Sequence, residues 1–123
     1  MNIYVSHSSS YDFETELYDP LRQLSPDHTL YFPHTGENEG SYSKPIISGS
    51  DVVLAEVSHS SSGQGIELGW ADAMGVPIIC FYRNDATVSK ALAIICTEFI
   101  TYTSTDEMLS LVRARLESMH PGA

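Results

Sequence analysis

The chain has 123 residues, of which 42% are hydrophobic, and this is enough for one domain with a buried core. Six Lys and Arg side chains stand against sixteen Asp and Glu, which gives a formal net charge of −10. This balance argues against nucleic acid as a partner, because phosphate backbones are bound by clustered cations and these six are scattered. We expect one domain over residues 1–120 and a frayed tail over 121–123.

The first part of the chain predicts two strands separated by a helix. Apolar runs at residues 3–5 and 28–32 are typical of strands. Between them, apolar residues recur at helical spacing over residues 13–24, with Pro20 as a kink or an early end. The polar stretch 33–42, rich in Gly and Asn, predicts a mobile loop that can close over a site.

The later segments repeat this alternation. A short helix is predicted over residues 43–48, apolar strands at 77–82 and 99–102, and a helix over 88–95. Residues 104–107 form a capping box for the last helix. Repeated β-α units with apolar strands predict a single doubly wound, flavodoxin-like α/β domain, with about five parallel strands and helices on both faces.

The most informative segment runs from residue 51 to 71. Residues 52–57 form the apolar run of a buried parallel strand, and residues 58–65 are mostly small, so their amides and hydroxyls can approach a ligand. We expect a helix to begin near Gln64, with Glu67 in its first turn, where the helix dipole favours an ionised carboxylate. Beyond the carboxyl ends of parallel strands, such a carboxylate can act as nucleophile or base. Glycines that merely permit a tight turn explain the same pattern without chemistry.

Cysteine and histidine usage indicates no metal centre. Cys80 and Cys96 sit in apolar runs and are predicted to be buried thiols. His7, His34 and His59 can converge at the strand ends, but their spacing matches no metal signature, and we expect no metal and no cofactor. The amino-terminal residues lack the pattern of a signal peptide, and no apolar run approaches the ~20 residues of a membrane helix. We therefore expect no membrane partner and a cytoplasmic location.

Three runs together resemble the core motif of the nucleoside 2-deoxyribosyltransferase family, which includes the deoxynucleoside 5'-monophosphate N-glycosidases. They are Ala55-Glu-Val-Ser, Ser60-Ser-Ser-Gly-Gln-Gly-Ile-Glu-Leu-Gly-Trp-Ala71 and Gly75-Val-Pro-Ile-Ile-Cys80. The resemblance implies an enzyme that cleaves or transfers at the N-glycosidic bond of a (deoxy)nucleoside or nucleoside 5'-monophosphate. The family's nucleophilic Glu matches Glu67, and the first-strand Tyr that holds it matches Tyr4. These two are the implied catalytic residues, acting through a glycosyl-enzyme intermediate.

The resemblance also implies a set of substrate-binding residues. The family's Ser or Asp that contacts the 5' end of the sugar matches Ser61, whereas Ser43 stands where the family has an Asp that protonates the leaving base. Glu37 and Glu39 lie nearby as possible substitutes. Family members assemble as dimers or larger, which implies a homo-oligomer with a small-molecule nucleoside or nucleotide as its partner. The candidate substrate-binding residues are Ser61, Ser62, Gly63, Gly65, Ser6, His7 and Ser43.

Two alternatives stay open. Ser43 in place of the Asp is compatible with a non-catalytic nucleotide-binding module that has kept the pocket and lost turnover. The segment Val5-Ser-His-Ser, followed by Tyr11-Asp12, resembles the first-strand motif of TIR domains, some of which cleave NAD with a helix-borne Glu. This second resemblance implies an NAD glycohydrolase or a signalling domain.

Overall fold

The computed structural model of the protein describes residues 1–38, 40, 42–96 and 98–119. The predicted tail, residues 121–123, and the last residue of the expected domain lie outside these ranges, and so does Glu39. Within the described ranges, no helix is both long enough and apolar enough to cross a membrane.

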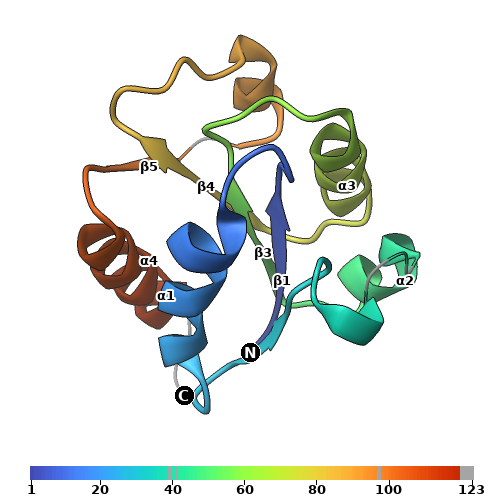
Figure 1. Ribbon diagram of the computed structural model, residues 1–123. Helices are drawn as coiled ribbons and strands as arrows, with labels where there is room; N and C mark the ends of the chain where they lie inside the picture. The colour runs from blue at the N-terminus through green and yellow to red at the C-terminus, as the bar shows by residue number, and fades with distance from the viewer. Residues whose placement is uncertain (39, 41, 97, 120–123) are drawn as a thin grey trace.

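A five-stranded parallel sheet with the order β2-β1-β3-β4-β5 forms the centre of the molecule (Figure 1). The strands are β1 (Asn2–His7), β2 (Thr29–Tyr31), β3 (Val52–Glu56), β4 (Ile78–Arg83) and β5 (Phe99–Tyr102). The order changes direction at β1, because β2 lies on one side of β1 and the next strand, β3, lies on the other side of β1. Ligands of open α/β sheets bind beyond the carboxyl ends of the strands at such a switch point.

Helical segments cover both faces of the sheet, as predicted. On one face α1 (Asp19–Leu21) packs near α4 (Thr105–Met119), and on the other α2 (Ser43–Ser48) packs against α3 (Ser62–Ala73) (Figure 1). Successive side chains of a strand point to opposite faces. Thus Ile3 and Val5 of β1 join the core beneath α1 and α4, and Tyr4 joins the core beneath α2 and α3. The two cores confirm the doubly wound α/β domain.

The segment between β1 and β2 is helical but changes its winding twice. A π-helix, η1 (Glu14–Tyr18), leads into α1 and then into a 3-10 turn, η2 (Arg22–Leu24). Pro20, which was expected to kink or end the helix, does not end it but lies in the first turn of α1, where the winding changes. The N–H of Asp19 reaches back five residues to the carbonyl of Glu14. This wider turn relieves the clash that a proline ring makes with the carbonyl four residues earlier.

Two connections contain 3-10 turns that the sequence did not predict. The polar stretch after β2 begins with a 3-10 turn, η3 (Gly36–Asn38), and the side chains of Thr35 and Asn38 donate to the carbonyl of Phe32 at 2.9 and 3.1 Å. The predicted helix over residues 88–95 is a 3-10 turn, η4 (Lys90–Ile94). These two hydrogen bonds to the Phe32 carbonyl hold the start of the loop against the end of β2.

The two cysteines lie in the core between the sheet and α3. Cys80 is on β4, Cys96 follows η4, and both side chains are buried free thiols. Their burial confirms the prediction made from their apolar surroundings. Neither thiol lines the cavity beside β1 that is described below.

Candidate active site

Glu67 lies on α3 and faces the carboxyl-terminal half of β1. The Tyr4 hydroxyl donates a hydrogen bond to Glu67 Oε2, and the Ser6 hydroxyl donates to Oε1 at 2.9 Å. Because Tyr4 and Ser6 are two residues apart on a strand, their side chains point to the same face. One strand therefore presents two donors to one carboxylate, and both carboxylate oxygens are held.

Tyr4 is built to remain a donor. Its side chain is completely buried and stacks on Tyr31 of β2, with ring centroids 5.6 Å apart. Burial, and then the hydrogen bond to Glu67, raise the pKa of Tyr4 far above its usual value. The nearby Ser43 hydroxyl, at the start of α2, partly offsets this rise in the pKa of Tyr4. Tyr4 therefore orients Glu67 as a neutral hydroxyl.

The start of α3 differs from the expected one. The helix begins at Ser62, and Ser61 is its N-cap, with Oγ accepting from the backbone N–H of Gln64 at 3.3 Å. The expectation that Glu67 lies in the first turn is therefore wrong. Because the influence of the helix dipole falls off within the first turn, the groups that act most directly on the Glu67 carboxylate are the hydroxyls of Tyr4 and Ser6.

Gln64 ties the start of α3 to two strands. Its side-chain amide donates to the carbonyl of Ser6 at 3.2 Å and to the carbonyl of Glu56 at 2.8 Å, and the side chain is buried. These two bonds span the carboxyl ends of β1 and β3. They fix the helix above the switch point of the sheet, one turn before Glu67. The sequence analysis used Gln64 only as a marker of the helix start.

A cavity of about 400 Å³ opens beside Glu67. One wall is the start of α3, with Ser61, Gly63, Gln64 and Glu67. The other walls come from three segments that follow strands or begin α2, and they contribute His7, Ser9, Pro33, His34, Gly40 and Ser43. The volume is in the range of small-molecule sites. Four predicted binding residues thus share this cavity with Glu67, and Ser6 lies behind its carboxylate.

A second hollow, of about 420 Å³, lies against the other side of the α3 start. Ser62 and Gly65 line it together with apolar side chains such as Leu68 and Leu92. Glu67 is not among its lining residues, whereas Ser61 and Gln64 contribute to both spaces. The structure thus divides the predicted binding residues between two hollows on either side of one helix start.

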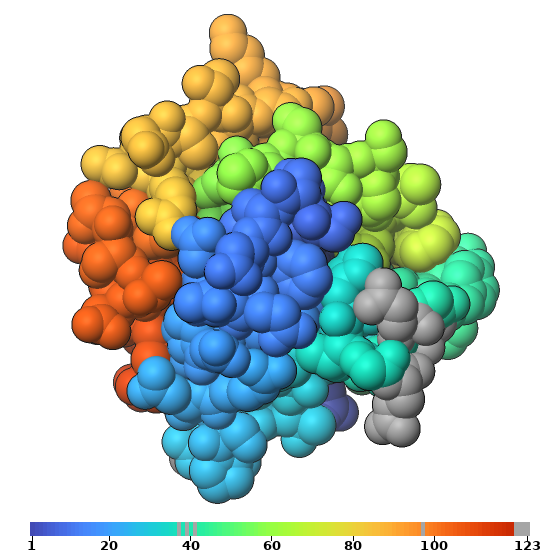
Figure 2. Space-filling view, viewed as in Figure 1, coloured from blue at the N-terminus to red at the C-terminus, as the bar shows by residue number. Residues whose placement is uncertain are grey.

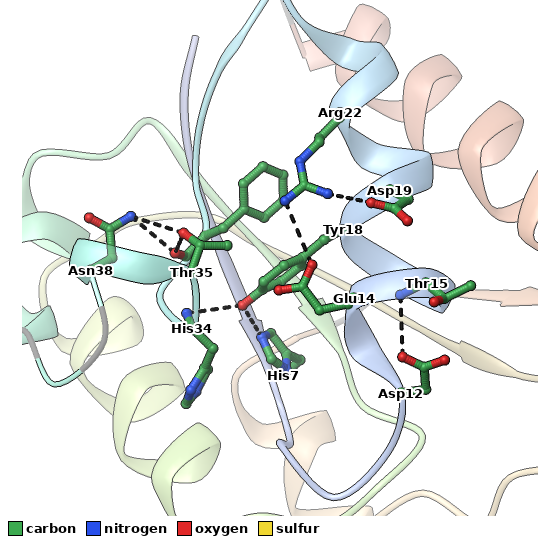
Figure 3. A network of polar contacts seen from close by, with 11 residues as sticks. His7, Asp12, Glu14, Thr15, Tyr18, Asp19, Arg22, His34, Thr35 and Asn38 are labelled. Carbon is green, nitrogen blue, oxygen red and sulfur yellow. Dashed lines mark hydrogen bonds and ion pairs between the residues drawn. The ribbon is translucent and has the colours of Figure 1, made fainter.

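A chain of hydrogen bonds joins the ends of β1 and β2 through η1 (Figure 3). His7 Nδ1 donates to the carbonyl of Ser8 at 2.8 Å, and His7 Nε2 accepts from the Tyr18 hydroxyl. Burial lowers the pKa of His7 to about 4, so the ring is neutral near pH 7. The Tyr18 hydroxyl in turn accepts from the backbone N–H of His34 at 3.2 Å.

Aromatic rings gather around this network. The His34 ring lies 5.1 Å from that of His7, and His59 stacks on Tyr11 at 4.5 Å. His7 and His34 thus lie side by side at the strand ends, and Tyr11, whose ring lies 6.5 Å from that of His7, links them to His59. Among the described residues, no group of three or more His, Cys, Asp or Glu side chains is placed to hold a metal ion. Figure 2 shows the residues after β1, in blue, at the surface between the start of α3 in green and the segment after β2 in cyan.

A buried carboxylate that the sequence analysis missed, Glu56, ends β3. Its side chain is 1% exposed and accepts from the Ser58 backbone at 2.6 Å, from Ser58 Oγ at 2.8 Å and from the Tyr102 hydroxyl. Burial, and then the bond to Glu56, raise the pKa of Tyr102. Because three donors satisfy this carboxylate, it fastens the β3–α3 turn to β5 and does not face the cavity.

Comparison with known proteins gives one local match in sequence. No family model matches the chain. A 34-residue segment, 28% of this chain, is 56% identical to the 5-hydroxymethyl-dUMP N-hydrolase of Rattus norvegicus, and the Mus musculus enzyme matches equally. The matched segment spans about a fifth of these relatives, 21% and 20% of their lengths.

Solved structures match over most of the chain. A Clostridium botulinum CMP N-glycosidase superposes with a TM-score of 0.73 at 18% identity, covering 94% of this chain and 99% of that one. A 2-deoxyribosyltransferase from Bacillus psychrosaccharolyticus gives 0.63 at 15% identity, covering 89% and 90%. That of Leishmania mexicana gives 0.54 at 21% identity, covering 66% and 63%. The protein therefore has the fold that the motif around Glu67 predicted, that of nucleoside 2-deoxyribosyltransferase-like proteins.

Proposed function

We propose that the protein cleaves, or transfers at, the N-glycosidic bond of a (deoxy)nucleoside or nucleoside 5'-monophosphate, with Glu67 as the nucleophile. The observation that carries this is a carboxylate held on both oxygens by Tyr4 and Ser6 at the wall of a 400 Å³ cavity. Proteins that share the fold include a CMP N-glycosidase and 2-deoxyribosyltransferases. The local sequence match is to 5-hydroxymethyl-dUMP N-hydrolases. All of these act at the same kind of bond.

The proposed reaction proceeds through a covalent intermediate. One carboxylate oxygen of Glu67 forms a bond to C1' of the sugar while the C1'–N bond breaks, through an oxocarbenium-like transition state. The resulting glycosyl ester is resolved by water, which gives a hydrolase, or by a second base, which gives a transferase. Tyr4 and Ser6 keep the carboxylate aimed at C1'. Ser61 and the amides at the start of α3 are suited to the 5' end of the sugar.

Base release, followed by chromatography, tests the proposal. The panel contains deoxynucleosides, deoxynucleoside monophosphates, ribonucleotides and NAD. We expect release by the wild type that falls by about 10³-fold or more in Glu67→Ala, because the nucleophile is removed. Tyr4→Phe keeps the buried ring and removes one donor to a charged group, so we expect a loss of about 10- to 100-fold.

The same panel separates the alternatives. Release that persists in Glu67→Ala would contradict a nucleophilic Glu67. Saturable nucleotide binding without release would favour the non-catalytic module that Ser43 suggests, and release from NAD alone would favour the TIR-like glycohydrolase. Assembly into a homo-oligomer and a cytoplasmic location stay predictions, which light scattering and cell fractionation test directly.

A further inference from the structure

Breaking the bond to an ordinary base requires a proton. The bonding electrons stay on the base, and protonation of the departing ring typically contributes about 10²- to 10⁴-fold. At the position where the family resemblance places an acid, this chain has Ser43. An alcohol is not an acid at neutral pH, so Ser43 cannot replace that acid. The cavity therefore needs another donor.

Among the described residues that line the cavity, only His7, His34 and Glu67 carry an imidazole ring or a carboxyl group. Glu67 is the proposed nucleophile. Both ring nitrogens of His7 are engaged, Nδ1 with the Ser8 carbonyl and Nε2 with Tyr18, and its side chain is only 4% exposed. His7 is thus a neutral part of the wall, and His34 is left as the candidate donor.

The backbone of His34 is held at the end of β2. Its N–H donates to the Tyr18 hydroxyl, which also bonds to His7, and this holds the residue at the end of β2. Figure 3 shows the His34 ring pointing away from the turn of Thr35 and Asn38. The ring is partly exposed, packs edge-on against His7, and lines the cavity opposite the start of α3.

We propose that His34 is the general acid that protonates the leaving base. This rests on the proposed function of Glu67. As the Glu67 oxygen bonds to C1', the C1'–N bond breaks, its electron pair goes to the base, and an imidazolium N–H of His34 transfers its proton to a base nitrogen. Water then attacks C1', the bond to Glu67 breaks, and the water proton passes to the neutral imidazole. The sugar gains a hydroxyl, the base gains a proton, and both side chains return to their starting forms.

Leaving groups that need no proton provide the test. A 7-methylguanine base is cationic in the nucleotide and departs as a neutral molecule. Nicotinamide, which is about as large as a pyrimidine base, is also cationic in its nucleotide and departs neutral. Release is measured for the best ordinary base of the wild type and for its cationic counterpart. The variants are His34→Gln, then Glu37→Gln and Glu39→Gln for the other two candidate acids, and His28→Gln as a matched histidine control just before β2.

We expect His34→Gln to lower kcat for the ordinary base by about 100-fold or more and for the cationic base by less than about 5-fold. Ser43→Asp in the His34→Gln background should restore release of the ordinary base. Among the described residues, His7 of β1 and Tyr18 of η1 contact His34, and Glu67 of α3 lines the same cavity. Because burial lowers the pKa of His7 to about 4, a loss of the alkaline limb of the kcat profile in His34→Gln would not come from His7.

Three results would overturn the assignment. Equal losses for both kinds of base in His34→Gln would show a structural role, and no loss for either would show no role. A selective loss in Glu37→Gln or Glu39→Gln instead would assign the acid to that residue. A wild type that releases neither kind of base would refute the proposed function itself, which is a different outcome from an active wild type with an unaffected His34 variant.

Discussion

The hydrogen bonds that orient the Glu67 carboxylate also lower its reactivity as a nucleophile. Hydrogen bonds donated to a carboxylate withdraw electron density and weaken it as a nucleophile, yet an unheld side chain rarely points at the reacting carbon. Tyr4 and Ser6 bond to both oxygens and leave the remaining lone pairs for the substrate. Because positioning can supply about 7–11 kcal/mol of a barrier, a modest loss of intrinsic reactivity is outweighed.

The buried His7 should make the protein sensitive to mild acid. Burial lowers its pKa from 6.5 to about 4, so between these values the unfolded chain binds a proton that the folded protein does not. Folding stability from this group is therefore complete above pH 6.5 and is lost as the pH falls toward 4. We expect a loss on the order of 3 kcal/mol over this interval. Urea unfolding at several pH values measures it.

His7→Gln is the comparison that isolates this effect from the carboxylates. The variant is expected to be less stable than the wild type at pH 7.5, because the bond to Tyr18 is weakened. Its unfolding free energy should fall less steeply between pH 6.5 and 4.5. Parallel slopes for the two proteins would mean that groups other than His7 dominate the acid response.

At the scale of elements, one glycine inside α3 and one just after its end predict opposite effects of substitution by Ala. Gly75 ends the helix with φ +73°, a left-handed conformation that side chains disfavour, whereas a Cβ at Gly69 in the helix interior would meet no atom within 4 Å. We expect Gly75→Ala to destabilise the protein by about 1–2 kcal/mol. Gly69→Ala should stabilise it by about 0.5–1 kcal/mol through helix propensity. Denaturant midpoints measure both, and a stabilised Gly75→Ala would contradict the backbone argument.

The regular elements were predictable because their signals are local. Apolar runs marked all five strands, and the capping box at 104–107 marked the start of α4. The winding of η1 and η2 was not predictable, because helical spacing from Phe13 to Leu24 does not distinguish π, α and 3-10 turns. The start of α3 was misplaced by two residues, since three adjacent serines are equally suited to be the N-cap and only packing selects Ser61.

At the scale of the whole molecule, the site combines residues that lie far apart in sequence. The motif pointed to the pair of Glu67 and Tyr4, which the structure brings into contact because α3 packs beside β1. The network of His7, Tyr18 and His34 gave no comparable signal, because its bonds depend on how η1 packs on the sheet. The general rule that strand ends gather at one edge pointed to His34, but not to its role.

The charge of the whole molecule should set how salt affects substrate capture. The net charge is −10, all six Lys and Arg lie in the described part of the chain, and none of them lines the cavity. Arg22, Arg83 and Arg115 are paired with carboxylates. A nucleoside monophosphate should therefore be repelled on approach, and salt should screen the repulsion, because the Debye length falls from about 30 Å at 0.01 M to about 8 Å at 0.15 M.

We expect kcat/KM for a monophosphate to rise by about 2- to 5-fold between 0.01 and 0.15 M salt, and that for an uncharged nucleoside to stay constant. Steady-state kinetics on such a pair with the same base measures the difference, because the base and the chemical step are shared. If kcat/KM for the monophosphate falls as the salt concentration rises, the amides at the start of α3 and the Ser61 hydroxyl attract the phosphate more strongly than the rest of the molecule repels it. The local field would then outweigh the net charge, and the 5'-phosphate would belong to the substrate.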